Sequence, residues 1–400
     1  MLSQAVILVG GLGTRLGARA ATTPKPLIEV GGRPFLEYLF DELTRYGVVR
    51  SIVLLAGHLG ARVAERYAGK PWRSARISVV QEASPLGTGG ALSNARDLLE
   101  REFLLLNGDS FLDFNLLDLV VPPLGSMTLL RMAVKREHRG EQYGRVIIEG
   151  DRLVGMLQPA DASGPINAGV YLMRREVLDW LPEAPCSLEA ALARLAERGL
   201  ISARAYDGYF IDIGVPAHLD RAQLELPRRL RRPAVFFDRD GVLNEDRGYV
   251  HRIEDVHWID GARAAVKCAN DGGYWVFVVS NQAGVARGLY GIDAVERVHA
   301  WMSEQLAEVG AHVDAFQYCP FHEAGSVAQY RRASDRRKPA PGMLLDCMAA
   351  WPVEVGPSLL IGDRASDLAA AAAAGINGHQ FVGGNLADFL APLIVKRLVA

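Results

Sequence analysis

Short aliphatic runs alternate with amphipathic stretches of helix length along most of the chain. Residues 5–9 and 52–56 are continuous apolar runs, whereas residues 35–46 repeat their apolar side chains every three to four positions. Continuous apolar runs predict strands buried on both faces, and the 3.6-residue repeat predicts helices that pack on them. Further strands are predicted at residues 77–80 and 103–106, and a further helix at 91–101. This alternation is typical of a doubly wound α/β fold.

The pattern becomes richer in strands after Met127. It predicts strands at residues 127–134, 145–148 and 169–173, with one helix near residues 187–198. We interpret this part as an added sheet that covers a ligand, and therefore as a substrate subdomain.

A charged run with a proline at each end, residues 227–233, interrupts the alternation. Basic runs also occur in nucleic-acid patches, but between two folded domains a solvated linker is the commoner structure. We therefore predict a first domain at residues 1–225, a linker at 226–233 and a second domain at 234–400.

The second domain repeats the alternation of strands and helices. Its predicted strands are residues 234–237, 275–279 and 359–361, and its predicted helices are residues 294–309 and 366–374. Residues 386–400 could form an amphipathic helix for packing or for dimerisation, which leaves a homo-oligomer open. The sequence thus predicts two doubly wound, Rossmann-like α/β domains.

Composition agrees with two domains in a soluble protein. The chain has 400 residues, half of them hydrophobic, which exceeds what one core usually organises. A net charge of -2 with 22% charged residues gives no general attraction to nucleic acid or to membranes. Four cysteines without paired spacing favour a reducing cytoplasm, and the apolar run at residues 5–9 is too short to span a membrane. We expect a cytoplasmic protein.

A glycine-rich turn follows the first predicted strand. Gly10, Gly11 and Gly13 would let backbone N–H groups approach a polyphosphate, although such a turn alone is often only a tight turn. Arg15 follows closely, and Lys25 lies between two prolines that fix its backbone. These two cations could neutralise a triphosphate and its pyrophosphate leaving group.

Two carboxylates follow later predicted strands in this domain. Asp109 ends an Asn-Gly-Asp sequence, and Asp212 begins an Asp-Ile-Gly sequence. Paired carboxylates that hold Mg²⁺ are what attack on an α-phosphate requires.

Together these motifs resemble the sugar-1-phosphate nucleotidyltransferases over residues 1 to about 222, and within them the heptose-1-phosphate guanylyltransferases. The matching motifs are residues 10–16, 24–27, 85–91, 107–109, 167–171 and 212–214. The resemblance implies that Arg15 and Lys25 act on the phosphates and that Asp109 and Asp212 bind Mg²⁺. It further implies that Asn167 and Glu189 bind the sugar. The nucleotide-binding residues that it implies are Gly10, Gly11, Gly13, Thr14, Gly87, Thr88 and Gly89.

Two residues bear on the ligands of this domain. Glu82 falls near where the resemblance places the base, and its carboxylate could accept both N1–H and N2–H of guanine, which favours GTP. The alternative is a solvated surface glutamate. Gln158 stands where many such enzymes have a lysine for the sugar phosphate, so another cation must serve or this domain is slow or inactive.

The second domain opens with Asp238 and Asp240 directly behind an apolar run. The first carboxylate could attack phosphorus and form an aspartyl-phosphate, while the second protonates the leaving oxygen and then activates water. Paired acids alone are often loop carboxylates. Here Ser280, Lys338 and Asp363 each follow or flank a later predicted strand, and together they would form one crevice at the carboxyl ends of the strands.

This order of residues resembles the haloacid-dehalogenase phosphatase superfamily. Residues 248–251, 258–261, 281–288, 318–320 and 338–343 further resemble the heptose-1,7-bisphosphate 7-phosphatases, and the histidinol-phosphate phosphatases share much of this pattern. The resemblance implies roles for each motif residue. By this resemblance, Asp238 is the nucleophile and Asp240 is the general acid and base. Ser280 and Lys338 bind the phosphate, and Asn281 and Arg337 position the substrate. Asp238, Asp240 and Asp363 bind Mg²⁺, and Asp367 supports that site.

One departure concerns zinc. Relatives often bind it through Cys-x-His and a Cys-x-Cys that precedes Arg-Lys-Pro, whereas this chain retains only Cys319 in place. Zinc prefers four ligands, so we do not expect it, although His322 with Asp335 could form a weaker site.

Taken together, the sequence predicts a bifunctional enzyme that removes the C7 phosphate of a heptose 1,7-bisphosphate and joins the 1-phosphate to a nucleotide. The two reactions would be consecutive. Alternatives are a phosphatase fused to a nucleotide-binding module, and a histidinol-phosphate phosphatase with an unrelated partner domain.

Overall fold

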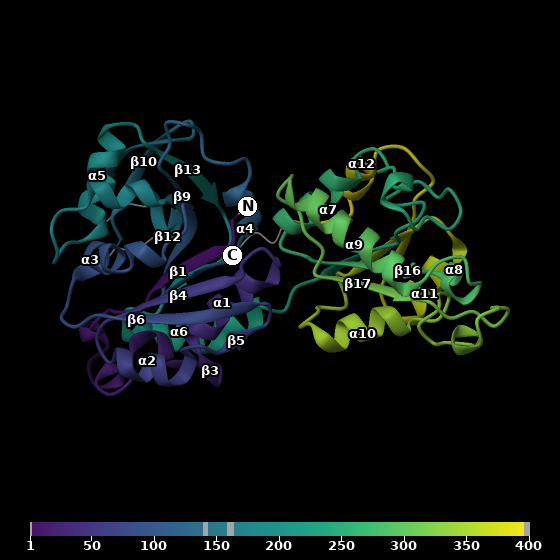
Figure 1. Cartoon of the computed structure of the whole chain (residues 1–400), viewed down its shortest axis with the longest axis horizontal. Helices are drawn as coiled ribbons and strands as arrows, with labels where there is room; N and C mark the ends of the chain where they lie inside the picture. The colour runs from purple at the N-terminus through teal and green to yellow at the C-terminus, as the bar shows by residue number, and fades with distance from the viewer. Residues whose placement is uncertain (1, 139–142, 158–163, 396–400) are drawn as a thin grey trace. The chain divides into compact units, whose positions relative to one another are not determined.

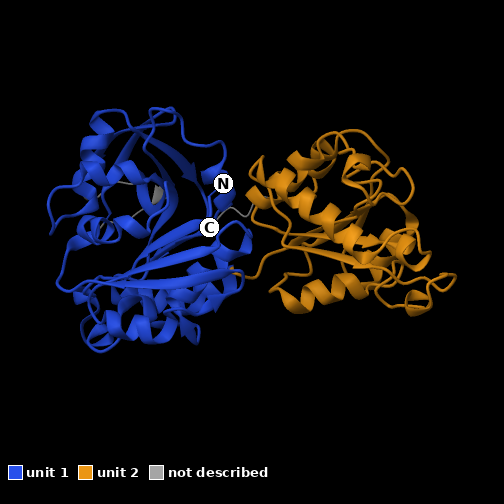
Figure 2. Ribbon diagram, viewed as in Figure 1, with its two compact units in different colours: residues 1–229, 398–400 blue, residues 230–397 orange. Residues whose placement is uncertain are grey.

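The computed structural model describes residues 2–138, 143–157 and 164–395 (Figure 1). The chain divides into two compact units, the first ending at Arg229 and the second beginning at Leu230 (Figure 2). Each unit has its own hydrophobic core around its own sheet. The prediction of two Rossmann-like α/β domains is confirmed. Among the described residues, no helix is long and apolar enough to cross a membrane.

The first unit is built on a ten-stranded sheet in which β1, β4, β6 and β7 are parallel neighbours. The strand-rich half expected after Met127 adds β9 to β13 to the same sheet. Across the sheet, the order is β10-β11-β13-β9-β12-β7-β1-β4-β6-β5. The strands are β1 (Gln4–Leu8), β4 (Ser51–Ala56), β5 (Pro71–Trp72), β6 (Ala75–Gln81), β7 (Glu102–Asn107), β9 (Leu130–His138), β10 (Arg145–Glu149), β11 (Arg152–Leu157), β12 (Gly164–Arg174) and β13 (Ile201–Tyr206).

Helices cover both faces of this sheet (Figure 1). On one face lie α1 (Phe35–Arg45), α2 (Gly60–Tyr67) and α6 (Pro216–Arg229), and on the other α3 (Gly87–Asn94) and α5 (Leu188–Glu197). The remaining elements are α4 (Leu116–Val120) and the short strands β2 (Glu29–Val30), β3 (Arg33–Pro34), β8 (Ser110–Leu112) and β14 (Phe210–Asp212).

The helix predicted at residues 91–101 begins earlier and ends earlier than expected. It starts at Gly87 inside the glycine-rich motif, where the N–H groups of Gly89 and Gly90 both donate to Cys186 O. A separate 3-10 turn, Arg96–Leu98, follows it. A contact distant in sequence therefore sets this boundary.

The second unit has a five-stranded parallel sheet in the order β17-β16-β15-β18-β19. Its strands are β15 (Ala234–Phe237), β16 (Trp275–Asn281), β17 (Ala315–Cys319), β18 (Leu359–Gly362) and β19 (Asn377–Gln380). One face packs on α7 (Ala262–Asp271), α9 (Ile292–Ala307) and α12 (Leu386–Leu390), and the other on α10 (Gly342–Ala350) and α11 (Ala365–Ala373). A single turn, α8 (Ala283–Ala286), follows β16.

The boundary between the two units falls within residues 226–233, which the sequence predicts as a linker. Helix α6 continues through Pro227 to Arg229. Arg232 is 1% exposed, and its guanidinium lies 4.9 Å from the centre of the Trp275 ring. Its backbone N–H donates to Pro352 O, and its carbonyl oxygen accepts from Glu354 N. Arg232 is therefore not solvated as the charge run predicts, because its guanidinium stacks on a buried indole that the sequence does not reveal.

The helix predicted at residues 386–400 is also shorter than expected. It spans Leu386–Leu390, capped by the Asn385 side chain, and Pro392 follows, which cannot continue a helix. Residues 396–400 lie outside the described part of the chain.

Phe277 tests the core of the second unit. It is fully buried between Phe236 and Trp351. Phe277→Ala should lower the free energy of unfolding by about 3–5 kcal/mol, because it leaves a cavity in a packed core. Leu345→Ala, at a 46% exposed position in the same unit, is the control and should change it by less than about 0.5 kcal/mol. Urea unfolding measures both, and an equal effect of the two changes would contradict the packing described.

Candidate active sites

A cleft of about 560 Å³ opens at the carboxyl ends of β1, β4, β6 and β7 in the first unit. It is where loops of an open α/β sheet usually bind ligands. Eight of the predicted residues line it, namely Gly10, Gly11, Lys25, Glu82, Gly87, Thr88, Asp109 and Glu189. His58 and Asn107, which the sequence did not single out, line it as well.

Two cations and two carboxylates meet beside this cleft. The Lys25 ammonium group pairs with Asp109 Oδ2. Three side chains surround Gly214: a β-carbon added to this glycine would lie 2.6 Å from Asp212 Oδ1, 3.1 Å from Lys25 Nζ and 3.2 Å from Arg15 Nη2. The structure thus gathers four residues that the sequence placed far apart. Such a group offers positive charge for phosphates and oxygen ligands for a divalent cation.

Asp212 is the more buried of the two carboxylates. Its Oδ1 accepts a hydrogen bond from Gly214 N at 2.6 Å, and its Oδ2 lies 3.4 Å from His218 Nδ1. Among the described residues, Oδ2 accepts no hydrogen bond. A buried carboxylate oxygen of this kind fits a role as a Mg²⁺ ligand.

The glycine-rich loop at residues 86–90 is tied to the start of α5. Leu188 N donates to Thr88 Oγ1 at 2.8 Å, and Thr88 Oγ1 lies 3.4 Å from Glu189 Oε2. Gly87 has φ +76°, and a β-carbon there would lie 2.4 Å from Cys186 O. Glycine is therefore required at this position by both conformation and space.

Glu82 is half-buried in the cleft. Its Oε2 accepts a hydrogen bond from Leu86 N at 3.1 Å, and a β-carbon on Gly10 would lie 3.3 Å from its Oε1. The side chain is therefore held between the first glycine turn and the loop at residues 86–90. This placement favours a ligand-facing carboxylate over a solvated surface residue.

Other predicted residues of the first unit lie outside the cleft lining. Gly13 begins the 3-10 turn Thr14–Ala20, in which Thr14 is exposed, and Gly89 is buried against Cys186. Both ends of the Asn167 amide are bonded within the unit, to Tyr171 OH at 2.6 Å and Gly169 N at 2.9 Å. Gln158 lies outside the described residues.

The second unit has a cleft of about 380 Å³ at the carboxyl ends of β15, β16 and β18. Its lining contains the predicted residues Asp238, Asp240, Ser280, Asn281, Arg337, Lys338 and Asp367. Arg287, Tyr290 and Arg364 also line it, and the sequence analysis did not assign them a role. The cleft is rich in charge of both signs.

Lys338 forms the centre of the buried charges in this cleft. Its Nζ lies 2.9 Å from Asp238 Oδ1 and 2.6 Å from Asp367 Oδ1, and it donates to Val279 O at 2.8 Å. Burial alone would lower the pKa of Lys338, but Asp238 and Asp367 outweigh burial and raise it. The ammonium group is therefore charged at neutral pH.

Burial raises the pKa of Asp238 to about 7, although the Lys338 charge acts in the opposite direction. Its Oδ1 also accepts a hydrogen bond from Arg239 N at 2.7 Å. A carboxylate with a raised pKa is a stronger base and a better nucleophile once it is ionised.

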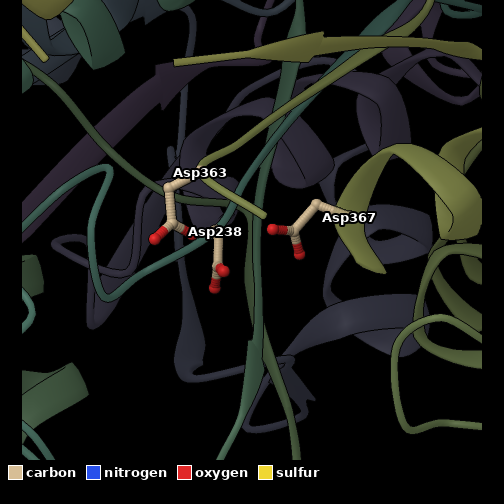
Figure 3. A group of neighbouring side chains, drawn as sticks. All are labelled: Asp238, Asp363 and Asp367. Atoms are coloured by element: carbon tan, nitrogen blue, oxygen red, sulfur yellow. The ribbon is translucent and has the colours of Figure 1, made fainter. Parts of the chain in front are cut away.

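Three carboxylates of the second unit converge on one point (Figure 3). Asp238, Asp363 and Asp367 each offer an oxygen within 4.8 Å of the others. Burial raises the pKa of Asp363, and its Oδ1 is buried without a hydrogen-bond partner among the described residues. Gly241 has φ +88°, and a β-carbon there would lie 2.4 Å from Asp363 Oδ2. Clustered, partly desolvated oxygens of this kind fit a hard divalent cation such as Mg²⁺.

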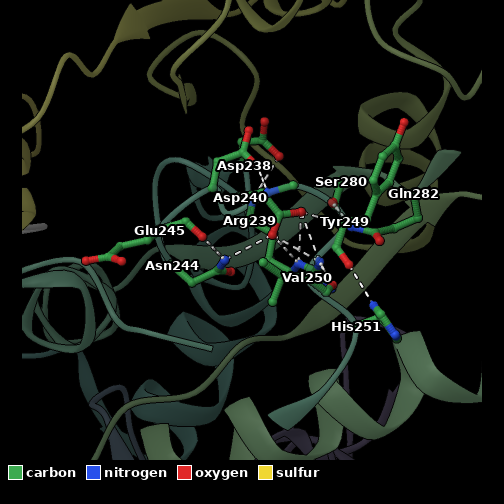
Figure 4. A network of polar contacts seen from close by, with 12 residues as sticks. Asp238, Arg239, Asp240, Asn244, Glu245, Tyr249, Val250, His251, Ser280 and Gln282 are labelled. Atoms are coloured by element: carbon green, nitrogen blue, oxygen red, sulfur yellow. Dashed lines mark hydrogen bonds and ion pairs between the residues drawn. The ribbon is translucent and has the colours of Figure 1, made fainter. Parts of the chain in front are cut away.

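The Asp240 carboxylate is not in this group of three, and its part in the Mg²⁺ site remains a prediction. It is bonded instead by Arg239, by Asn244 Nδ2 at 3.0 Å and by Gln282 Nε2 at 3.1 Å (Figure 4). Arg239 reaches both of its oxygens, with Nη2 at 2.9 Å from Oδ2, and also donates to Val250 O. These contacts fix the position of Asp240 in the cleft lining.

Arg239 and Asn244 were missed by the sequence analysis. Both are fully buried. An arginine between two acids is a signal that could have been used for Arg239, since a buried carboxylate needs a partner. Nothing in the sequence distinguishes Asn244 from a loop asparagine.

Ser280, Asn281 and Arg337 lie in the lining of this cleft. Ser280 Oγ accepts a hydrogen bond from Gln282 Nε2 at 2.7 Å, and Asn281 exchanges two bonds with the backbone of Lys338, at 3.0 and 3.1 Å. Asn281 therefore holds the lysine segment against the end of β16.

Lys338→Met should lower the free energy of unfolding by about 3–5 kcal/mol, because it leaves Asp238 and Asp367 buried without their cation. Denaturant unfolding at pH 8, above the Asp238 pKa of about 7, measures this. Adding Asp367→Asn to that variant should restore part of the loss. Arg364→Met, which breaks a surface ion pair with Asp246, is the control and should cost at most about 1 kcal/mol. Equal losses in the two single variants would contradict a buried charge centre.

The two units are similar to two different families of known proteins. A sequence profile of the family described as nucleotidyl transferase matches residues 4–227, and one described as HAD-hydrolase-like matches residues 335–384. UDP-glucose pyrophosphorylase from Acinetobacter baumannii covers 56% of this chain and 93% of its own length, with TM-score 0.50 and 20% identity. It supports the fold of the first unit.

The second unit is similar to named phosphatases. D-glycero-beta-D-manno-heptose-1,7-bisphosphate 7-phosphatase of Rhodopseudomonas palustris is 45% identical over 166 residues, which are 42% of this chain and 92% of that protein. The protein of the same name from Escherichia coli K12 is 40% identical over 150 residues, or 38% of this chain and 78% of that protein. The chain thus belongs to the nucleotidyl transferase family through its first unit and, through its second, to the family of the D-glycero-beta-D-manno-heptose-1,7-bisphosphate 7-phosphatases.

Proposed function

We propose that the chain catalyses two consecutive reactions of nucleotide-activated heptose synthesis. The second unit would hydrolyse the C7 phosphate of D-glycero-D-manno-heptose 1,7-bisphosphate, and the first would transfer a nucleotide from an NTP to the resulting heptose 1-phosphate. The observation that carries this proposal is one chain with both a phosphatase unit similar to heptose bisphosphate phosphatases and a nucleotidyl transferase unit. The product of one reaction is the kind of substrate that the other requires.

In the phosphatase unit, Asp238 attacks the phosphorus atom while the bond from phosphorus to the C7 oxygen breaks. Asp240 gives a proton to that oxygen, and the phosphoryl group is left on Asp238. Asp240 then takes a proton from the water molecule that hydrolyses this aspartyl-phosphate to inorganic phosphate. Arg239 holds Asp240 in position for both proton transfers.

Charge in this cleft matches a phosphate ester. Lys338 and Ser280 line the cleft and would bind the phosphoryl oxygens, and Mg²⁺ at Asp238, Asp363 and Asp367 would offset the negative charge of both phosphate and carboxylates.

In the nucleotidyl transferase unit, an oxygen of the sugar phosphate attacks the α-phosphorus of the NTP, and pyrophosphate leaves. Lys25 and Arg15 neutralise the phosphates, and Asp109 and Asp212 would hold Mg²⁺. Glu82 reads guanine by accepting its N1–H and N2–H groups, whereas adenine offers only a lone pair at N1. The nucleotide is therefore GTP.

A histidinol-phosphate phosphatase is the second candidate for the second unit, because the motifs overlap. The linkage to a nucleotidyl transferase favours the heptose, since histidinol would give the first unit no sugar 1-phosphate. Comparing turnover of the two phosphate esters decides between them.

Matched substitutions should separate the two activities. Asp238→Asn should lower phosphate release by about 10³-fold or more while nucleotidyl transfer from heptose 1-phosphate continues. Asp109→Asn should lower pyrophosphate release by about 10²-fold and leave phosphate release intact. Both products are measured on the full-length protein, with each variant as the control for the other. Phosphate release that survives in Asp238→Asn would remove the nucleophile assignment.

Glu82→Gln should reduce the preference for GTP over ATP by about tenfold, because the amide cannot accept both guanine donors and loses a charged hydrogen bond. The ratio of kcat/KM values for the two nucleotides measures it. Equal use of GTP and ATP by the unsubstituted protein would rule out this role for Glu82.

A further inference from the structure

The segment from Phe321 to Arg337 leaves the end of β17 and carries Arg337 into the phosphatase cleft. It contains one 3-10 turn, Ala328–Tyr330, and otherwise neither helix nor strand. A long irregular segment needs contacts or a bound ion to keep one conformation. In relatives with the Cys-x-His and Cys-x-Cys pattern, zinc would supply that restraint.

The side chains at those positions do not fit zinc. Counting from Cys319 and back from Lys338 places Phe321, Ser334 and Arg336 where the pattern has its other ligands. A phenyl ring has no donor atom for a metal, and a guanidinium is a permanent cation. Zinc requires four ligands of the Cys, His or carboxylate type.

His322 does not replace the missing ligands. Its Nδ1 accepts a hydrogen bond from Ala324 N at 3.0 Å. Burial and the charges of Arg337 and Arg287 lower the pKa of His322, whereas Glu323 acts in the opposite direction. Among the described residues, neither His322 nor Cys319 belongs to a cluster of three metal-binding side chains.

Arg336 instead fixes the segment immediately before Arg337. Its guanidinium donates to Gln317 Oε1 on β17 and lies 3.1 Å from Asp346 Oδ2 on α10. Its backbone N–H donates to Ser334 Oγ at 3.2 Å, and Arg337 N donates to Ser334 O at 3.1 Å. The Arg336 side chain thus joins β17 to α10, and its backbone closes a turn with Ser334.

A second group of contacts holds the beginning of the segment. The Arg332 guanidinium lies 4.0 Å from the centre of the Phe321 ring, and the Tyr330 ring centre lies 6.0 Å from it. His322 N donates to Tyr330 O at 3.1 Å, which closes the loop. Phe321 O in turn lies 3.5 Å from Arg337 Nη1. Both groups of contacts therefore end at Arg337.

We propose that Arg336, together with the cluster of Phe321, Tyr330 and Arg332, holds this loop in place of a metal ion, and that Arg336 is a positioning residue for Arg337. The contact of Arg337 with substrate rests on the proposed phosphatase function. The anchoring of the loop does not.

Arg336→Met in the full-length protein tests both statements. Chymotrypsin cleavage after Phe321 and Tyr330 should become about tenfold faster, because the loop opens more often. The KM for heptose bisphosphate should rise about tenfold with kcat within about twofold, since Arg337 binds substrate but does not react. Turnover of p-nitrophenyl phosphate, which lacks the remaining substrate, should change little. Arg336→Lys keeps the charge and should restore part of both effects.

Arg297→Met is the matched control, because Arg297 forms an exposed ion pair with Asp293 elsewhere in the same unit. It should leave cleavage and KM unchanged, and a zinc-selective chelator with Mg²⁺ present should leave the wild type unchanged. Stoichiometric zinc in the purified protein, or an Arg336→Met variant that behaves like Arg297→Met, would overturn the proposal. Failure of the wild type to hydrolyse the bisphosphate would count against the proposed function alone, because cleavage rates still decide the anchoring.

Discussion

The ammonium group of Lys338, buried between Asp238 and Asp367, is the interaction on which the phosphatase site depends. Asp238 follows β15, Lys338 precedes α10 and Asp367 lies in α11. The ion pairs therefore hold three separate parts of the second unit together. A buried lysine without these carboxylates would lose its charge, and the carboxylates without the lysine would repel each other. Asp363 adds a third carboxylate that the lysine does not neutralise, which leaves negative charge for a divalent cation.

The first unit also places buried or half-buried carboxylates beside fixed cations in its cleft. Lys25 pairs with Asp109 and approaches Asp212 at Gly214, beside Arg15. In both units the loops at the carboxyl ends of parallel strands carry these residues, because such strands end at one edge of the sheet. Each site therefore combines fixed cations with carboxylates, which suits the phosphates and the Mg²⁺ that we propose for it, although the two units differ in topology and in the reaction that we propose for each.

The sequence predicted the elements and motifs that depend on local pattern. Apolar runs located the central strands of both sheets, whereas β11, β13, β17 and β19 were not predicted. Asp109 and Asp238, which follow predicted strands, line the two clefts. Features set by distant contacts were missed. Arg232 is buried on Trp275 rather than solvated, and the Asp240 carboxylate accepts a hydrogen bond from Gln282, which follows β16. Side-chain direction and stacking depend on tertiary packing, which a single sequence does not reveal.

The central claim is that one chain converts a heptose bisphosphate to a nucleotide-activated heptose through two linked sites. Mass spectrometry of the products formed from heptose 1,7-bisphosphate, Mg²⁺ and an equal mixture of the four NTPs tests it most directly. We predict inorganic phosphate, pyrophosphate and a single GDP-heptose. Heptose 1-phosphate as the final product, with all four NTPs unchanged, would contradict the claim.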